Sequence, residues 1–490
     1  MCYYKNILKI TILAVLTASF SSCGKDFLEV VPKGVAIATK TSDYELLLNK
    51  SGLEWVEVST HVVMPDVLAG YEPRYTPGLF GLGGRHFMRA FEYQDDIYLP
   101  ESKTSEMSLL DQMYHYNKVI NEVMKSTGGN DAQKKALHSE ARVARAWLHF
   151  LLVNYYGKPY NAATAATDPG IPLFTVADVT QTTFTRASVQ AVYDLIIADL
   201  TEALPNLSPR IISRFRISRS TGEAMLGKVY MNMQRFDKAL PLFASVISNL
   251  SNADIPVRLY DFNTEFSAGG TFLPVHPVNG PNRIDVATDE EVLYIKYSYN
   301  NFNYYASGAP INPQTSALYS PADLRLKFLS KFPFSSTVAY PHNMMRGIGK
   351  IGNDMGVNVP DILLLKAECE SRAGQLGNAV NDLVAFRKKR MNNTVAGAAD
   401  IPANVAGDKI ALTKYILEER IREYATTGER WWDMRRLSVD ETYKSTVGMV
   451  HHVYNEAGNI VKSFPLKPER FTLRIPKYIE NQNPGMTQNP

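Results

Sequence analysis

Apolar positions recur at helical spacing through most of the chain. From Ala141 to Tyr155 they follow one another at the intervals of a single helical face, and the pattern ends at Gly157 and Pro159. Comparable faces run through residues 192–204 and 236–250. Because this spacing gathers side chains on one side of a helix, the sequence predicts a mainly α-helical protein.

Two stretches carry a finer pattern that predicts paired antiparallel helices. Gly227 is followed twelve residues later by Ala239 and then by Phe243, and the same separation joins Ala367 to Ala379. These offsets match the tetratricopeptide signature, in which small residues let two helices approach closely. We therefore expect tetratricopeptide-like helix pairs as a stacked scaffold, with degenerate pairs near residues 111–155 and 188–204.

Three segments lack the helical period. Residues 61–100 are rich in Gly, Pro and aromatic residues and predict a long structured loop, while residues 251–356 predict an insertion rich in Pro, Asn and Tyr. Residues 438–490 predict loop and short strand. Within the insertion, residues 292–299 alternate as a strand does, with these residues on one face: Leu293, Ile295, Tyr297 and Tyr299.

The N-terminus has the features of a secretory signal. Lys5 and Lys9 precede an apolar run from Ile10 to Phe20, which is too short to span a bilayer, and two serines then lead directly to Cys23. Small residues before a cysteine are similar to a bacterial lipobox, so we expect Cys23 to be acylated as residue one of the mature chain. A plain secretory signal, in which Cys23 is incidental, is the alternative.

Charge and cysteine content narrow the function. The chain has 52 Lys+Arg against 49 Asp+Glu, and removal of Lys5 and Lys9 leaves 50 against 49, which argues against a nucleic-acid binder. With Cys23 acylated, Cys369 has no partner, so we expect no internal disulfide and a buried Cys369. Tyrosine dominates the aromatics, with 27 Tyr beside 21 Phe and 4 Trp, and tyrosine suits hydrated binding surfaces as well as cores.

Several motifs together resemble one family. The stretches that carry the resemblance are CGKDFL from Cys23, ARVARAWLHFLLVNYYGKP from Ala141, LLLKAECESRAG from Leu363, LEERIREYATTGERWWDMRRL from Leu417 and the ending IPKYIENQNPGMTQNP. They stand in the order that is typical of SusD/RagB-like outer-membrane lipoproteins, and they run from Cys23 to Pro490. The chain is therefore identified as similar to that family.

The resemblance implies both a fold and a function. The fold is a SusD-like α-α superhelix in which tetratricopeptide-like pairs carry irregular loop and short-strand insertions. The function is that of a surface lipoprotein that captures oligosaccharide, or in some relatives peptide, and delivers it to a SusC-type TonB-dependent transporter, without being an enzyme. The chain then divides into a signal peptide at residues 1–22, an N-terminal helical region at 23–250, an insertion at 251–356 and a C-terminal region at 357–490.

The residues themselves offer little catalytic or metal chemistry. No serine-hydrolase elbow, zincin helix or zinc-spaced cysteine pair is present, so we expect no catalytic residue, metal or cofactor. His451 and His452 are adjacent, and we expect a loop or surface pair rather than a metal site. In the charge-dense stretch from Leu417 to Leu437, charges recur three to four residues apart around Trp431 and Trp432, which favours a structural clamp over a transporter contact.

Sugar recognition needs aromatic faces for stacking and polar side chains for hydroxyls. The two segments that offer both supply the candidate ligand residues Tyr71, Arg74 and Tyr75, with Asp66 nearby, and Asn300, Phe302, Asn303, Tyr304 and Tyr305. We expect the two segments to meet as a shallow platform. The alternative is that these tyrosines pack the insertion onto the helices, in which case Trp55 and Tyr319 are the next aromatics to consider.

Two other classes of protein stay open. A tetratricopeptide adaptor would need a long uninterrupted repeat array, and this chain interrupts its repeats with aromatic-rich segments. A lipid-anchored glycoside hydrolase would need two carboxylates placed astride the scissile bond, which no spacing here predicts.

Overall fold

The computed structural model describes residues 38–76, 85–102, 105–276, 278–282, 284–299, 307–349 and 352–490. Helices dominate this part of the chain. The longer helices are α2 (Thr41–Leu48), α4 (Leu109–Glu122), α5 (Asp131–Tyr156), α6 (Val189–Ala203), α7 (Arg219–Asn232), α8 (Phe236–Asn249), α12 (Val359–Arg372), α13 (Leu376–Lys388), α15 (Lys409–Tyr424) and α16 (Glu429–Ser438). The prediction of a mainly helical protein is confirmed.

Shorter elements connect the long helices. The short α-helices are α3 (Arg85–Phe91), α9 (Phe262–Glu265), α11 (Pro313–Ser316), α14 (Ala403–Ala406) and α17 (Lys477–Gln482). The 3₁₀ helices are η2 (Thr60–Val63), η3 (Glu72–Arg74), η5 (Glu106–Ser108), η6 (Val123–Lys125), η7 (Leu204–Asn206), η8 (Leu324–Phe328), η9 (Pro341–Asn343), η10 (Lys444–Thr446) and η11 (Pro468–Phe471). The stretch 61–100, predicted as one long loop, thus contains η2, η3 and α3, because a loop this rich in aromatics buries them with short helical turns.

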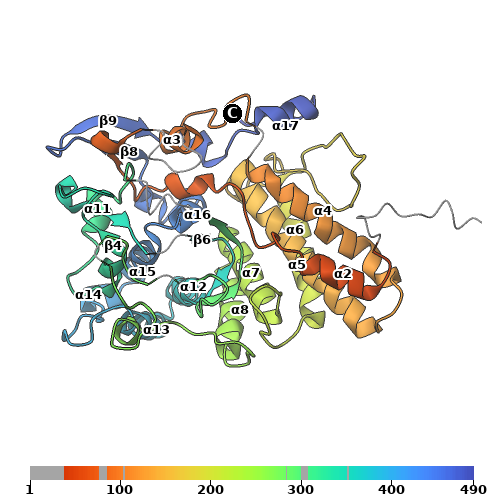
Figure 1. Cartoon of the computed structure of the whole chain (residues 1–490), viewed down its shortest axis with the longest axis horizontal. Coiled ribbons are helices and arrows are strands. Elements are labelled where there is room, and N and C mark those ends of the chain that lie inside the picture. The colour runs from red at the N-terminus through yellow and green to blue at the C-terminus, as the bar shows by residue number, and fades with distance from the viewer. Residues whose placement is uncertain are drawn as a thin grey trace, which may run out of the picture.

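The helices pack as a curved series (Figure 1). Each helix from α4 to α8 contacts the next one along the chain, and α8 contacts α12. The helix α12 in turn contacts both α13 and α15. In the view of Figure 1 this series passes from α4, α5 and α6 on the right, through α7 and α8, to α13 and α15 on the left. The hairpin of β8 and β9 lies with α3 and α17 along the opposite, upper edge.

The two predicted helix pairs are α7 with α8 and α12 with α13. Gly227 lies under the Phe243 ring so closely that a Cβ atom there would come within 2.5 Å of Phe243 Cε1. Ala239 and Phe243 are fully buried. Gly374 follows α12 with a φ of +78°, which is the left-handed turn that ends a helix at glycine. The tetratricopeptide-like pairing is confirmed.

Within the described residues, the strands are short and belong to four small sheets. They are β1 (Gly70–Tyr71), β2 (Val292–Tyr294), β3 (Tyr297–Tyr299), β4 (Leu329–Ser330), β5 (Arg346–Gly347), β6 (Gly352–Asp354), β7 (Val357–Asn358), β8 (Val450–Tyr454) and β9 (Ile460–Pro465). The order β1-β8-β9 forms the largest sheet, in which β1 is parallel to β8 and β8 is antiparallel to β9. The other pairs, β2-β7, β3-β6 and β4-β5, are antiparallel.

The strand predicted at residues 292–299 is corrected. It is split into β2 and β3, and both of its faces are buried, since Leu293 and Lys296 are 0% and 1% exposed. The break lies at Lys296, whose ammonium donates to the Leu53 carbonyl at 2.6 Å and to Gln112. The segment around Leu53 covers the face of the strand that carries Lys296.

Candidate functional site

The loop after η2 and the insertion lie side by side, joined by backbone hydrogen bonds. The Ala69 N–H donates to the Pro310 carbonyl and the Tyr71 N–H donates to the Gly308 carbonyl, each at 2.9 Å. Gly308 follows the predicted ligand segment 300–305 after only two residues. The described residues that follow this segment thus lie beside Ala69 and Tyr71, while residues 300–305 lie outside the described part of the chain, and their meeting with the first segment stays a prediction.

An aromatic cluster fills the junction between these segments. The rings of Tyr71 and Tyr340 meet edge to face with centroids 5.0 Å apart, and Met344 and Tyr454 complete the cluster. The Tyr340 hydroxyl donates to the Ser307 carbonyl at 3.0 Å. Burial raises the pKa of both tyrosines, so their hydroxyls stay protonated at neutral pH. The cluster holds the chain in a fixed position where it leaves the predicted ligand segment.

Two exposed apolar side chains lie on the segment next to the aromatic cluster. Phe332 is 45% exposed and Val338 is 60% exposed. Arg346, itself buried, donates from Nε to the Phe332 carbonyl at 2.9 Å and lies over the Phe334 ring with its Cζ atom 5.7 Å from the centroid. The Phe334 N–H donates to Ser307 Oγ at 2.7 Å. We name this face, formed by residues 69–76 and 307–346, the aromatic junction.

The predicted ligand residues have different positions. Tyr71 and Tyr75 are only 2% and 9% exposed, and the Tyr75 ring packs on Phe91 and Phe464, so the packing alternative describes these two tyrosines. Arg74 is half-buried at the surface. The predicted residues that lie outside the described part of the chain are Cys23, Asn300, Phe302, Asn303, Tyr304 and Tyr305.

Sequence reasoning missed Phe332, Tyr340 and Arg346. The stretch Phe332-Pro333-Phe334 does carry the same combination of aromatic residues and proline that drew attention to residues 300–305. No periodic pattern, however, separates the exposed Phe332 from the buried Tyr340. Trp55 and Tyr319 are both partly buried, Trp55 against the edge of the Tyr297 ring and Tyr319 through its hydroxyl to the Arg422 carbonyl at 2.8 Å.

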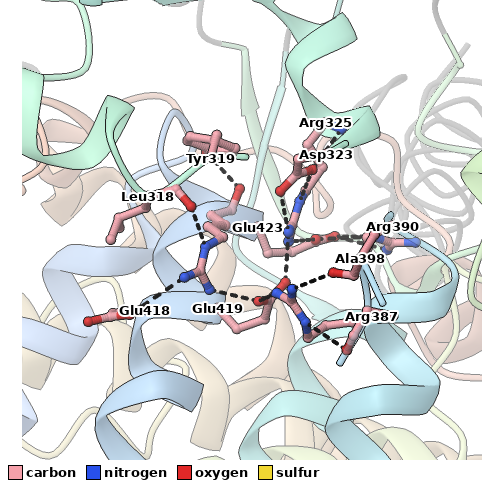
Figure 2. A network of polar contacts seen from close by, with 12 residues as sticks. Leu318, Tyr319, Asp323, Arg325, Arg387, Arg390, Ala398, Glu418, Glu419 and Glu423 are labelled. Carbon is pink, nitrogen blue, oxygen red and sulfur yellow. Dashed lines mark hydrogen bonds and ion pairs between the residues drawn. The ribbon is translucent and has the colours of Figure 1, made fainter. Parts of the chain in front are cut away.

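The charge-dense C-terminal stretch forms a buried ionic network (Figure 2). Glu419 on α15 is fully buried and lies at its centre. Its carboxylate accepts from Arg325 at 2.7 Å, from Arg422 at 2.7 Å and from Arg387 at 2.5 Å. Glu423, one helical turn later, accepts from Arg325 and Arg390. The network therefore joins η8 of the insertion to α13 and α15 of the scaffold.

Burial alone would raise the pKa of Glu419, but the guanidinium groups of Arg325, Arg422 and Arg387 lower it to about 2. A carboxylate that is enclosed by three cations and fully hydrogen-bonded stays ionised at any physiological pH. The structural clamp predicted from the sequence is confirmed for this helix.

A separate ion pair involves the loop that precedes the aromatic junction. Arg430 on α16 holds the carboxylate of Asp66 with two hydrogen bonds of 2.9 Å, and Asp66 also accepts from the Gly448 N–H at 2.7 Å. Asp66 lies in the loop that leads into β1, so its predicted availability to ligand is corrected to a structural ion pair. Trp431 is buried as predicted, and Gly428 turns the chain between α15 and α16 with a φ of +87°, tight against His61.

No group of three or more metal-ligating side chains exists among the described residues. His451 and His452 lie on β8 rather than in a loop and face opposite sides of the strand. His451 is fully buried between Phe91 and Tyr93, and burial lowers its pKa.

Cys369 is buried as predicted and donates its thiol hydrogen to the Met231 sulfur. Within the described ranges, no helix has the length and apolar character that crossing a membrane requires.

Comparison with known proteins shows which families this chain resembles. Residues 92–231 match a family described as "Starch-binding associating with outer membrane", and residues 359–490 match the SusD family. A SusD-like protein, P38, from Formosa agariphila is 24% identical over 352 residues, which cover 61% of this chain and 65% of the relative. The chain thus matches somewhat less than two thirds of that relative's length.

Solved structures share the fold along nearly the whole chain. A SusD superfamily protein from Bacteroides thetaiotaomicron has a TM-score of 0.63 at 18% identity, with 92% of this chain and 100% of that chain covered. A protein named as a putative sugar binding protein from Bacteroides vulgatus has a TM-score of 0.62 at 19% identity, with 93% and 99% covered. A SusD-like carbohydrate binding protein, also from Bacteroides vulgatus, has a TM-score of 0.61 at 15% identity, with 91% and 97% covered.

The scaffold consists of tetratricopeptide-like helix pairs. An aromatic insertion interrupts these pairs, and a buried ionic network holds the insertion in place. Together these features define a class of helical proteins whose binding faces are built from irregular loops. The two family matches together cover more than half of the sequence. This chain belongs to the SusD/RagB family.

Proposed function

We propose that this protein is a cell-surface lipoprotein of the outer membrane that binds oligosaccharide at the aromatic junction and delivers it to a SusC-type TonB-dependent transporter. The observation that carries the proposal is the pairing of residues 69–71 with residues 308–310 in a chain of this family. Near this pairing, half-buried Arg74 interacts electrostatically with Tyr71 and Tyr340. The Tyr340 N–H donates to the carbonyl of Lys331, the residue before the exposed Phe332.

The chemistry of this face suits a sugar. An exposed ring offers an apolar surface for the C–H face of a pyranose, and a guanidinium group donates to its hydroxyls. A face built from few rings and few polar groups supports micromolar to millimolar dissociation constants, which correspond to about −4 to −8 kcal/mol. Such weak binding suits a protein that must release its cargo to a transporter, and it requires no catalytic residue.

The ligand class is tested by titrating the mature chain with arrays of soluble oligosaccharides and of short peptides. Binding of at least one oligosaccharide is expected, with a tenfold or greater loss of affinity in Phe332→Ala. The melting temperature should stay unchanged, since the Phe332 ring is about half exposed. Binding of peptides alone would instead favour a peptide-capturing member of the family, and release of reducing sugar would favour a glycoside hydrolase.

The membrane attachment is tested separately at Cys23. In the proposed lipoprotein, Cys23→Ala removes the acylation site, so the protein should pass from the membrane fraction to the soluble fraction of fractionated cells. A serine two residues earlier provides the control, because Ser21→Ala leaves a small residue before the cysteine and should not change the fractionation. Full retention of the Cys23→Ala protein in the outer membrane, with the transporter deleted, would contradict the anchor.

A further inference from the structure

A second cleft lies away from the aromatic junction, at the end of α2. It has a volume of about 520 Å³, and its walls come from residues 48–54, from α4 and α5, and from the segment 213–217 that precedes α7. Clefts of about 300–1,000 Å³ are the size that small-molecule sites in proteins have. Every residue that lines it belongs to the described part of the chain.

The rim of this cleft exposes a phenylalanine. Phe215 is 49% exposed, and its N–H donates to Ser213 Oγ at 3.1 Å, which fixes the backbone of the turn that carries the ring. A half-exposed ring at the mouth of a cleft provides an apolar face at little cost in side-chain entropy.

The wall beside Phe215 is a preorganised polar pair. Arg216 binds Glu140 with two hydrogen bonds, Nε to Oε2 at 2.7 Å and Nη2 to Oε1 at 2.8 Å, and its Nη1 donates to Asn49 at 3.3 Å. Both side chains keep about 15% of their surface exposed. A paired guanidinium and carboxylate offer donors and acceptors side by side, which is what adjacent hydroxyls on a sugar ring require.

The charges in the cleft balance. Glu54 and Glu140 stand against Lys50 and Arg216, so a ligand with a net charge gains no attraction here. The lining also includes two tyrosines, Tyr116 and Tyr294, which are buried and whose hydroxyls add polar groups to an otherwise partly apolar wall. A neutral ligand rich in hydroxyls, with one apolar face, matches this lining better than an anion, an amine or an acyl chain.

We propose that this cleft is a second saccharide site, which takes a neutral monosaccharide or disaccharide with its C–H face on Phe215 and its hydroxyls on the Arg216–Glu140 pair. The ligand class rests on the proposed function, but the position and the residues of the site do not. The chain would then hold sugar at two separate places, at the aromatic junction and beside α2.

The test is a ligand-observed NMR titration of the mature chain with glucose, galactose, mannose, N-acetylglucosamine and their common disaccharides. Phe215→Ala should weaken at least one of these ligands tenfold or more, at an unchanged melting temperature. Ile212→Ala is the matched control, because Ile212 is 48% exposed on the same segment but does not line the cleft, and it should leave every titration unchanged.

The variants Phe215→Ala and Phe332→Ala distinguish the two proposed sites. A sugar signal that is lost in Phe215→Ala and kept in Phe332→Ala supports the second site. Signals that depend on Phe332 alone overturn the second site and leave the proposed function standing. Saccharide signals that neither variant changes overturn both positions. The absence of any signal from these monosaccharides and disaccharides overturns the second site, and the oligosaccharide array then tests the aromatic junction by itself.

Discussion

Gly227 is the residue on which the first helix pair depends most closely. A Cβ atom at this position would lie 2.5 Å from Phe243 Cε1 and 2.8 Å from Phe243 Cζ, and the Phe243 ring is fully buried. Gly227→Ala should therefore destabilise the protein by about 1–3 kcal/mol through overpacking, although alanine favours a helix. Thermal or urea unfolding measures this loss.

Gly377 provides the matched control for that substitution. It also lies within a helix, α13, but a Cβ atom there would meet nothing within 4 Å. Gly377→Ala should be neutral or stabilise the protein by up to about 1 kcal/mol, since only the helix propensity changes. Equal effects at the two glycines would show that α7 and α8 do not approach as described.

Lys296 makes stability depend on pH. Burial lowers the pKa of its ammonium from an ordinary value of 10.5 to about 7, although nearby Glu54 opposes the shift. Between these two values the unfolded chain binds the proton and the folded chain does not, so the free energy of unfolding should rise with pH from about pH 7 towards pH 10. The slope from this one group is at most about 1.4 kcal/mol per pH unit.

The variant Lys296→Met isolates this contribution. Urea unfolding of the wild type and the variant across that pH range should give curves that diverge, with the flatter curve belonging to the variant. Parallel curves would mean that the Lys296 ammonium stays charged in the folded protein. The absolute stability of the variant is less informative, because methionine also leaves the Leu53 carbonyl without its donor.

At the scale of elements, the ionic network is what holds the insertion onto the scaffold. Glu419→Gln would leave Arg325, Arg387 and Arg422 buried around a neutral group and should cost about 3–5 kcal/mol. In the wild type, the stabilisation from Glu419 should be present above the ordinary glutamate pKa and should be lost as the pH falls towards about 2. Unfolding curves measured along that pH range check both statements.

The preceding residue on α15 is a natural control. The Glu418 side chain is 44% exposed and approaches only Arg422, at 3.5 Å. Glu418→Gln should change stability by less than about 1 kcal/mol, as exposed ion pairs generally do. A loss from Glu418→Gln as large as that from Glu419→Gln would contradict the central position given to Glu419.

The elements that could be predicted were those with a local cause. The helix pairs follow from the spacing of Gly227, Ala239 and Phe243, and the clamp follows from charges three to four residues apart. The strand at residues 292–299 was predicted as one strand, but it is split into β2 and β3 at Lys296, which binds the Leu53 carbonyl some 240 residues earlier in the chain. A contact between segments so far apart in the chain produces no hydrophobic periodicity in either segment, so the sequence pattern cannot predict it.

At the scale of the whole molecule, the sequence indicated the family, but not which side chains face solvent. Tyr71 and Tyr75 were predicted as ligand residues, yet both complete aromatic clusters in the interior. Phe332 and Phe215 were not singled out, yet both are about half exposed. A tyrosine suits core and surface equally, so composition alone cannot separate the two roles.

The central claim is that sugar binds where the segments 69–76 and 307–346 meet. Hydrogen–deuterium exchange of the mature chain, with and without the oligosaccharide that binds best in the array, tests this most directly. We predict slower exchange in both segments when the ligand is bound, whether or not residues 213–217 also become protected. Unchanged exchange in both segments under saturating ligand would contradict the account, because the ligand would then bind at another face of the molecule.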